Sequence, residues 1–242
     1  MNRALAVDIR ALRFAWPGMQ NPLLEVEEFF VRPGEKVFIK GTSGCGKTTL
    51  LNLIGGILKP QTGAVHVLGV DLCKLSERER DTFRSDHMGM IFQMFNLIPY
   101  LSVAENVVLP CHFSSKRKER VLEKFSSVHK AMERLMEMLQ LSLADLAKRK
   151  ASELSVGQQQ RVAIARALIG TPEIVIADEP TSSLDEENRH SFLQLLFEEC
   201  DLSAATLLFV SHDGSLAKYF DRCLDLRDFK RMAAEPGEMK RC

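Results

Sequence analysis

The sequence lacks any apolar run approaching the roughly 18–20 residues that a helix needs to span a bilayer. It also lacks paired cysteines: its 6 cysteines are scattered without a CxxC spacing, which disfavours a zinc site or a disulfide framework. The apolar stretch near the N-terminus is short and Asp8 interrupts it, which disfavours a secretory signal. We therefore expect a cytoplasmic protein with reduced thiols.

The chain has no excess of charge of either sign, because 32 Lys and Arg residues balance 32 Asp and Glu residues. A primary nucleic-acid binder is expected to be strongly basic, so this balance argues against a nucleic-acid partner, although it leaves room for a local basic patch. The 242 residues, 45% of them apolar, suffice for one large domain or for one domain with subdomains.

Short strands alternate with helices at both ends of the chain. A strand is predicted over 36–40, and a glycine-rich loop and an apolar helix ending at Ile54 follow it. The apolar runs 174–177 and 206–210 are typical of buried parallel strands. Between these two parts, over 95–169, the pattern is helical. We therefore expect a strand-and-helix core that is split by a helical insertion.

The insertion carries a long amphipathic pattern. Ser102 and Glu105 form a capping-box pattern that begins a helix. Farther on, apolar residues at steps of three and four predict one helix from about Glu119 to Gln140. The charged side chains of this region favour a solvated face, with a docking surface as the alternative. They are Lys116, Arg117, Lys118, Arg120, Lys124, Lys130 and Arg134.

The segment from Gly41 to Thr48 matches the phosphate-binding loop pattern between a strand and a helix. Glycines let the backbone direct successive N–H groups at phosphates, and the following helix directs its positive end at them. Lys47 would neutralise the terminal phosphates, and the Thr48 hydroxyl would bind Mg²⁺. The predicted nucleotide-binding residues of this loop are Gly41, Ser43, Gly44, Gly46, Lys47, Thr48 and Thr49.

Asp178 and Glu179 follow the apolar run 174–177. Carboxylates at the carboxyl end of a parallel strand lie beside the crevice where such sheets bind ligands. We expect Asp178 to hold Mg²⁺, directly or through water, and Glu179 to orient or deprotonate the attacking water. Such a pair alone is more often an exposed turn, so the catalytic interpretation depends on the phosphate-binding loop upstream.

The run from Leu154 to Arg161, LSVGQQQR, is a short Ser/Gly turn that opens a helix. A helix N-terminus attracts anions, so the physics alone indicates a capped helix and a second anion site. The run resembles the signature motif of ABC ATPases. The order of the other motifs is similar to that family over nearly the whole chain.

The resemblance implies further roles. Gln93 matches the glutamine loop, which contacts Mg²⁺ and links to a transmembrane partner, and His212 matches the switch histidine at the γ-phosphate. Trp16 stands where the family has an aromatic side chain that stacks on adenine, with Phe14 as the alternative. Further residues are expected to meet the nucleotide bound by a facing copy. They are Ser155, Gly157, Gln158 and Asp185.

The fold implied by the resemblance is α/β: a RecA-like P-loop core with an N-terminal antiparallel β subdomain and an inserted α-helical subdomain. Residues 1–94 and 170–228 would form the β subdomain and the core, 95–169 the helical subdomain and 229–242 a tail, within one ABC ATPase domain over 1–242. Two copies are expected to face each other head to tail, with ATP and Mg²⁺ between them.

Within the family, residues 91–107 are similar to the lipoprotein-release, macrolide-export and cell-division ATPases. This implies an ATP-hydrolysing subunit at the cytoplasmic face of the inner membrane that energises a separate permease by transmitting force. The alternatives are a regulatory ATPase of the cell-division type and, less favoured, a soluble ABC ATPase. Apolar side chains would receive a permease helix, or would form internal core. They are Phe95, Leu97, Ile98 and Tyr100.

Two residues, one in the signature motif and one in the phosphate-binding loop, are expected to affect ATP hydrolysis and ATP binding. Val156 stands where the family usually has glycine. A valine keeps the backbone N–H but adds a branched side chain and resists a positive φ. We therefore expect slow hydrolysis if the site needs a tight approach to phosphate, and we expect function to survive because Gly157 is retained. Cys45 lies inside the phosphate-binding loop, and we expect alkylation of its thiol to weaken ATP binding.

Overall fold

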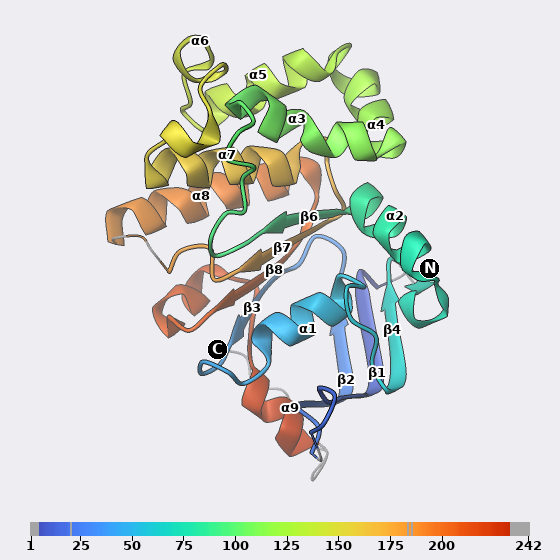
Figure 1. Ribbon diagram of the computed structural model, residues 1–242. Coiled ribbons are helices and arrows are strands. Elements are labelled where there is room, and N and C mark those ends of the chain that lie inside the picture. Colours follow the sequence, from blue (N-terminus) through green and yellow to red (C-terminus); the bar gives the residue numbers. More distant parts are fainter. Residues whose placement is uncertain (1–4, 20, 183, 185, 233–242) are drawn as a thin grey trace. The chain divides into compact units, whose positions relative to one another are not determined.

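The computed structural model describes residues 5–19, 21–182, 184 and 186–232 (Figure 1). It divides into two compact units, one formed by the chain up to Arg84 and from Thr206 onward, the other by residues 85–205. Both units contain strands and helices, and helix α2 (Glu77–His87) runs across the boundary between their segments. The predicted α/β class is confirmed.

The first unit contains an antiparallel sheet with the strand order β2-β1-β4-β5. Alternate residues of β1 and β2 are buried, as expected for a sheet with one face on the core. The pairing of β1 with β4 changes register between Arg10 and Arg13. The strands are β1 (Val7–Phe14), β2 (Leu24–Val31), β4 (Thr62–Val67) and β5 (Val70–Asp71).

Three parallel strands of the same unit pair in the order β8-β3-β9. All of β8 and the centre of β3 are buried, which explains their unbroken apolar runs. Helix α9 contacts β2. The strands are β3 (Lys36–Lys40), β8 (Thr206–Ser211) and β9 (Arg222–Asp225). The helices of this unit are α1 (Lys47–Ile54), the 3₁₀ turns η1 (Leu72–Lys74) and η3 (Gly214–Tyr219), and α9 (Leu226–Met232).

Helix α1 is fixed at its carboxyl end by two arginines of α2. Arg80 Nε donates to Gly56 O at 2.8 Å, and Arg84 Nη1 donates to Gly55 O at 3.2 Å. Cations are favourable at the negative end of a helix dipole. The helix that follows the glycine-rich loop is therefore anchored at the end away from that loop.

The second unit contains the parallel pair β6 (Met88–Ile91) and β7 (Ile174–Asp178). The long connection between them carries helices, and α3 contacts α4, α5 and α7 (Figure 1). The unit is wider than the predicted helical subdomain 95–169, which stays a prediction. Its helices are α3 (Val103–Phe113), α4 (Ser115–Phe125), α5 (Val128–Met138), α6 (Leu143–Leu146), η2 (Ala151–Glu153), α7 (Val156–Leu168) and α8 (Glu186–Ser203).

The start of α3 confirms the predicted capping box. The Ser102 hydroxyl accepts from Glu105 N at 3.2 Å, and Ser102 N donates to Glu105 Oε2 at 2.8 Å. These two bonds satisfy donors that the first turn of a helix leaves unpaired.

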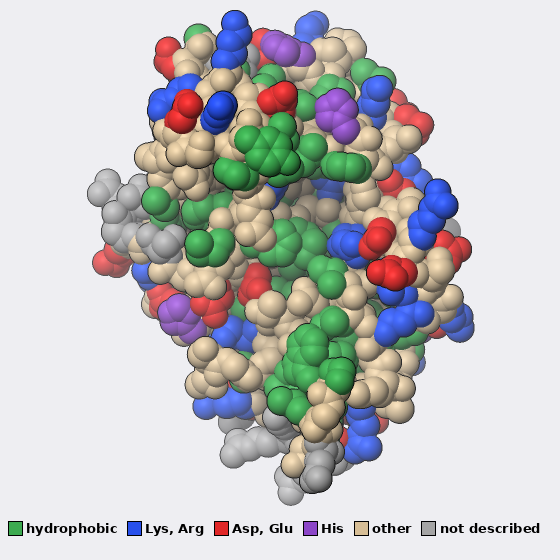
Figure 2. Space-filling view, viewed as in Figure 1, with side chains coloured by type: hydrophobic (Ala, Val, Ile, Leu, Met, Phe, Trp, Pro, Cys, Tyr) green, Lys and Arg blue, Asp and Glu red, His purple; other side chains and the backbone are tan. Residues whose placement is uncertain are grey.

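Hydrophobic side chains reach the surface on and before α3. Figure 2 shows such side chains gathered on the viewed face where α3 lies in Figure 1. The exposed fractions of Met94, Tyr100 and Phe113 are 79%, 73% and 75%, whereas that of Phe95 is 5%. Residues 97–98 are half-buried. The sequence left open whether these side chains form internal core or a surface for a permease helix. Phe95 belongs to the internal core, whereas Tyr100 faces solvent.

The single helix predicted over 119–140 is wrong. Helix α4 ends and α5 begins around a pair of serines, because Ser126 has a φ of 58° and the Ser127 hydroxyl accepts from Lys130 N at 3.1 Å. A serine that caps the next turn offers the backbone an alternative to continuing the helix. The apolar periodicity runs on across this break, which is why it suggested one element.

The expected solvated face is correct for the lysines and wrong for the arginines. Arg117 is 1% exposed, donates to Ala167 O and Ile169 O at 3.3 and 3.1 Å, and also donates to Met88 O. Burial lowers the pKa of Arg117 to about 10, so the side chain remains charged at pH 7. Lys116, Lys118, Lys124 and Lys130 are exposed.

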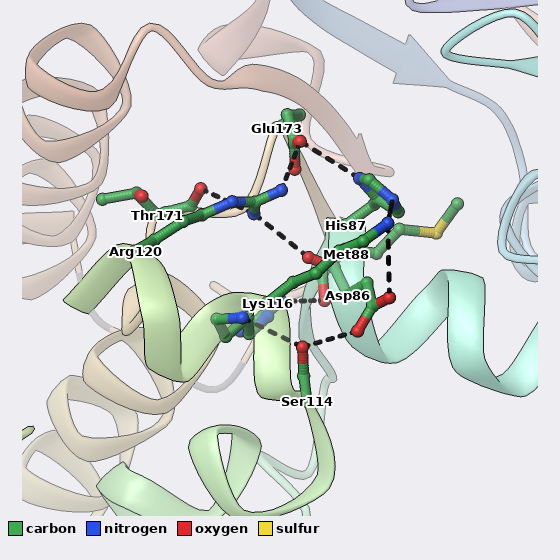
Figure 3. A network of polar contacts seen from close by, with 9 residues as sticks. Asp86, His87, Met88, Ser114, Lys116, Arg120, Thr171 and Glu173 are labelled. Carbon is green, nitrogen blue, oxygen red and sulfur yellow. Dashed lines mark hydrogen bonds and ion pairs between the residues drawn. The ribbon is translucent and has the colours of Figure 1, made fainter. Parts of the chain in front are cut away.

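Arg120 belongs to a polar network that fixes α4 (Figure 3). Its Nη2 donates to Glu173 Oε1 at 2.6 Å, and its Nη1 donates to Asp86 O at 3.1 Å. His87 Nδ1 lies 3.1 Å from the same Glu173 oxygen. Ser114, the residue before α4, donates its hydroxyl to Asp86 Oδ1 at 2.6 Å. Arginine serves here because its planar fork reaches several acceptors at once.

Candidate nucleotide site

The glycine-rich loop leads from β3 into α1. Gly44 and Gly46 have φ values of 75° and 107°, which glycine adopts without steric penalty. Lys47 is the first residue of α1, and its Nζ donates to Gly41 O at 2.9 Å and to Thr42 O at 3.1 Å. The ammonium group is thus held against the loop whose backbone would surround a phosphate.

The amino end of α1 suits an anion. Its first turn contains no acidic side chain, so its positive end is not neutralised locally. Ser43 and Thr48 are exposed at this end, whereas Thr49 is buried. The Thr48 hydroxyl is therefore placed where a metal bound to phosphate could meet it, and Thr49 would contribute through its backbone.

His212 follows the strand next to β3. Lys40 and Ser211 are partners in the parallel pairing of β3 with β8, so Gly41 and His212 both leave the sheet at the same edge. His212 is exposed there. The first unit thus brings the switch-histidine candidate and the phosphate-binding loop to one edge, as the sequence predicts.

The structure separates the two candidates for stacking on adenine. Phe14 is only 5% exposed, whereas Trp16 is 40% exposed in the loop after β1. Their rings meet edge to face, with centroids 5.2 Å apart and an interplanar angle of 85°. Stacking on a base requires an exposed ring, and of the two candidates Trp16 is the exposed one.

In the second unit, Gln93 and the carboxylate pair also share an edge. Ile91 and Ala177 are partners in the parallel pairing of β6 with β7, so Gln93 and Asp178 leave neighbouring strands at the same end. Glu179 follows with a φ of 47°. A residue other than glycine held in this region costs about 1–3 kcal/mol, and such strain is concentrated at functional sites.

Arg166 of α7 holds the loop that contains Gln93, a contact that sequence reasoning missed. Phe95 and Asn96 have positive φ values of 58° and 47°, and their carbonyls accept from Arg166 at 2.6 and 2.7 Å. Burial lowers the pKa of Arg166. The arginine lies in the run that resembles the signature helix, but the left-handed loop that needs it is not visible in the sequence.

The signature motif caps the start of α7. The Ser155 hydroxyl accepts from Gln158 N at 3.3 Å, and Ser155 N donates to Gln158 Oε1 at 3.1 Å. Val156 is helical with a negative φ, so its side chain causes no backbone strain there, and slow hydrolysis from a hindered approach to phosphate stays a prediction. A Cβ at Gly157 would have no atom within 4 Å, which leaves the start of the helix open to a ligand.

A cavity of about 450 Å³ lies beside this helix start, within the second unit. Ser155, Gly157 and Gln158 line it together with side chains of α6 and α8. The signature residues therefore border a hollow large enough for a small-molecule ligand. Asp185, the remaining residue expected to meet a facing copy, lies outside the described residues.

The candidate metal ligands have the chemistry that Mg²⁺ requires. Thr48 offers a hydroxyl, Gln93 an amide oxygen and Asp178 a carboxylate, all of them hard oxygen donors. Within the described ranges no group of three or more His, Cys, Asp or Glu side chains could hold a metal alone.

A family model described as ABC transporter matches residues 24–182. The chain belongs to the ABC transporter ATP-binding family. The lipoprotein-releasing system ATP-binding protein LolD of Porphyromonas gingivalis is 37% identical over 93% of this chain and 97% of its own length. An uncharacterized ABC transporter ATP-binding protein of Mycobacterium tuberculosis is 38% identical over 94% of this chain and 89% of its own length.

Two further matches are an ATP-binding/permease protein and a solved structure. The macrolide export ATP-binding/permease protein MacB of Rhodopseudomonas palustris is 35% identical over 92% of this chain, which corresponds to 33% of that protein. The dimeric post-hydrolysis structure of the ATP-binding cassette MJ0796 with ADP and Pi is 34% identical, covers 90% of this chain and 93% of its own, and has a TM-score of 0.75. As a member of this family, the chain binds ATP and is an ATPase. No helix in the described part of the chain is long and apolar enough to cross a membrane.

Proposed function

We propose that this chain hydrolyses ATP to power a separate membrane permease that transmits force across the inner membrane, in lipoprotein extraction or in export. Two relatives support this. LolD is named for lipoprotein release, and MacB is named as an ATP-binding and permease protein in one chain. The chain would be attached peripherally, through its permease, to the cytoplasmic face of the membrane.

The proposal rests on the exposed hydrophobic surface that begins one residue after Gln93. Met94, Tyr100 and Phe113 expose most of their side chains, and large hydrophobic side chains exposed in one segment favour a place where another protein docks. A short amphipathic helix of a permease suits such a surface. Because Arg166 joins the same segment to α7, docking and the signature motif would act on one helix.

The residues of the nucleotide site have roles that follow from their chemistry. Lys47 would neutralise charge on the transferred phosphate, and His212 would donate a hydrogen bond to it. Glu179 would orient or deprotonate the attacking water. Asp178, with Thr48 and Gln93, would hold Mg²⁺, which neutralises phosphate charge when bound.

ATP would join two copies head to tail. One copy would contribute the loop around Lys47, and the other would contribute Ser155 and the open helix start at Gly157. The solved MJ0796 cassette is dimeric, which supports this arrangement. Because the γ-phosphate would be part of the contact, binding would close the pair and hydrolysis would reopen it.

The test is a mild-detergent pull-down of the tagged chain from native membranes, followed by mass spectrometry, in wild type and in two variants. Tyr100→Asp places a charge on the proposed docking surface. Leu202→Asp is the matched control, because Leu202 is 59% exposed on α8, away from that segment in sequence. We expect a permease with wild type and with the control, and its loss with Tyr100→Asp while basal ATPase activity remains.

The identity of the captured partner decides between the alternatives. A permease with a large extracytoplasmic domain that moves or extracts a substrate after reconstitution supports force transmission for transport. A partner whose state changes with ATP while no substrate moves would support the regulatory alternative. Recovery with ribosomes or DNA alone would contradict the membrane-coupled function and leave the ATPase assignment intact.

A further inference from the structure

A glutamine side chain fastens the backbone next to Trp16. Gln61 Oε1 accepts from Ala15 N at 2.7 Å, and Gln61 Nε2 donates to Ala15 O at 2.9 Å. The backbone N–H of Gln61 also donates to Arg13 O at 3.0 Å. The amide group makes the two bonds that a further strand residue would make, so it extends the pairing of β4 with β1 beyond the last ladder pair.

The end of β1 needs the hydrogen bonds from Gln61 because the regular pairing of β1 with β4 is broken upstream. Between Arg10 and Arg13 the register shifts, and Ala11 has a φ of 46°. The backbone of Ala11 lies against Gly63, where a Cβ would come within 2.5 Å of Ala11 O. A bulge of this kind bends a strand and changes the direction of the side chains that follow it. The end of β1 and the loop beyond it are thus aimed by contacts downstream of the bulge.

The return side of the same loop is fixed to the phosphate-binding loop. Leu23 N donates to Phe14 O at 2.8 Å, which closes the hairpin behind Trp16. A Cβ at Gly46 would lie 2.8 Å from Leu24 Cδ2, so Leu24 packs directly on this glycine. The place of Trp16 relative to the phosphate-binding loop therefore depends on both sides of the hairpin, and Gln61 holds the side that carries the ring.

We propose that Gln61 is a positioning residue for the base of the bound nucleotide. It fixes the Ala15 backbone so that the exposed Trp16 side chain stands at a set place relative to the phosphate-binding loop. This inference rests on the proposed stacking of Trp16 on adenine. Gln61 would act through Trp16 and not on the phosphates, so its removal should weaken the base-dependent part of nucleotide affinity and leave the phosphate-dependent part unchanged.

The sole tryptophan of the chain makes this measurable, because all tryptophan emission comes from Trp16. Gln61→Ala removes both bonds. Gln61→Glu has the same length, keeps an acceptor for Ala15 N and loses the donor to Ala15 O. Thr62→Ala is the matched control, since Thr62 is an exposed neighbour whose side chain has no hydrogen bond within the described residues. Each variant is titrated with ATP and with tripolyphosphate, and kcat, KM and Tm are measured alongside.

We expect ATP to quench wild-type emission. In Gln61→Ala the quench should be smaller and ATP affinity about 3- to 10-fold weaker, because two exposed hydrogen bonds are lost. KM should rise with kcat nearly unchanged, because the base is bound equally in the ground state and in the transition state. Tripolyphosphate affinity should not change, Gln61→Glu should be intermediate, and Thr62→Ala should match wild type.

Equal ATP affinity and quench in Gln61→Ala and wild type would overturn the inference. An equal loss of tripolyphosphate affinity would also overturn it, because it would show general loosening of the site. If wild-type emission ignores ATP while hydrolysis proceeds, the stacking role of Trp16 fails and the inference fails with it, but the ATPase function stands.

Discussion

The two units hold their functional loops in left-handed conformations by different means. In the first unit, the phosphate-binding loop uses Gly44 and Gly46, which adopt positive φ at no steric cost. In the second unit, the corresponding positions after the strands are Phe95, Asn96 and Glu179, which are not glycine. There the conformation is maintained by surrounding contacts, with Arg166 bonded to both carbonyls of the loop after Gln93.

This difference separates a fixed part from a responsive part. Glycines enter the left-handed region without steric cost, so the shape of the phosphate-binding loop needs no contacts that offset strain, which suits a cradle for phosphate. A strained loop held by hydrogen bonds changes shape when those bonds change, which suits a segment that senses nucleotide or partner.

Lys47→Ala should have the largest effect. The variant loses the ammonium that the fixed loop holds at Gly41 and Thr42, so charge on the phosphates is no longer neutralised. We expect ATP hydrolysis to fall by about 10²–10³-fold with little change in Tm. A phosphate-release assay on the purified subunit checks this, and a fall of less than threefold would show that the loop is not the phosphate site.

Gly46→Ala should damage the fixed loop more than Gly44→Ala. At Gly46 the φ of 107° lies outside the ordinary left-handed region and a Cβ would press on Leu24, whereas at Gly44 φ is 75° and no atom lies within 4 Å. We expect Gly46→Ala to lower the free energy of unfolding by about 1–3 kcal/mol and to abolish ATP binding. Gly44→Ala should lose about 1 kcal/mol. Equal losses in urea denaturation would contradict the geometric distinction.

Arg166→Leu should release the responsive loop. Two charge-assisted hydrogen bonds to backbone carbonyls would be lost, a part-buried one to Phe95 O and an exposed one to Asn96 O. We therefore expect the free energy of unfolding to fall by about 1–3 kcal/mol and basal turnover to fall several-fold. Arg166→Lys keeps the charge but not the fork, and should recover part of both losses. If Arg166→Leu left both turnover and the protease sensitivity of residues 92–100 unchanged, the loop would not depend on this arginine.

Acid should weaken the second unit through Glu173. Burial alone would raise the pKa of Glu173, but the hydrogen bond with His87 and the charges of His87 and Arg120 hold that pKa below its usual value. The ionised carboxylate therefore stabilises the fold above the usual pKa of a glutamate, and this contribution is lost as pH falls through the lowered folded-state pKa. Urea denaturation of wild type and Glu173→Gln between pH 3 and 7 should give a difference that shrinks on the acid side, whereas a constant difference would exclude the ion pair as its cause.

Asn96→Gly should have the smallest effect. The substitution removes the cost of a positive φ at Asn96 but loosens the unfolded chain, so the free energy of unfolding should change by less than about 1 kcal/mol. The substitution is most informative in a double variant with Arg166→Leu. Asn96→Gly should recover part of the turnover lost in Arg166→Leu, because glycine adopts a positive φ without the steric cost that asparagine pays. A double variant no better than Arg166→Leu alone would argue against strain in the loop.

The parts that the sequence predicted are those that local chemistry determines. The strand over 36–40, the apolar strands 174–177 and 206–210 and the capping box at Ser102 all appear in the structure. Each of these elements follows from a short run of consecutive residues and depends little on contacts with distant residues. The alternation of strand and helix, with a helical stretch between two strands, was enough for the fold class.

The parts that the sequence did not predict depend on contacts between distant residues. Arg117 lies in a run of charges that favours solvent, yet it is buried because backbone carbonyls of Met88 in β6, Ala167 in α7 and Ile169 just after α7 converge on it. The break at Ser126 is hidden by an apolar periodicity that continues through it. Val156 stands where the family has glycine, and only the structure shows that its place in α7 needs no positive φ.

The most direct test of the central claim is sedimentation of the Glu179→Gln variant with Mg²⁺ and ATP. If Glu179 activates water and ATP joins two copies through Lys47 and the Ser155–Gly157 helix start, this variant should bind ATP, lose nearly all turnover and sediment as a dimer. With ADP it should sediment as a monomer. Wild-type turnover in Glu179→Gln, or a monomer at saturating ATP, would contradict the proposed site.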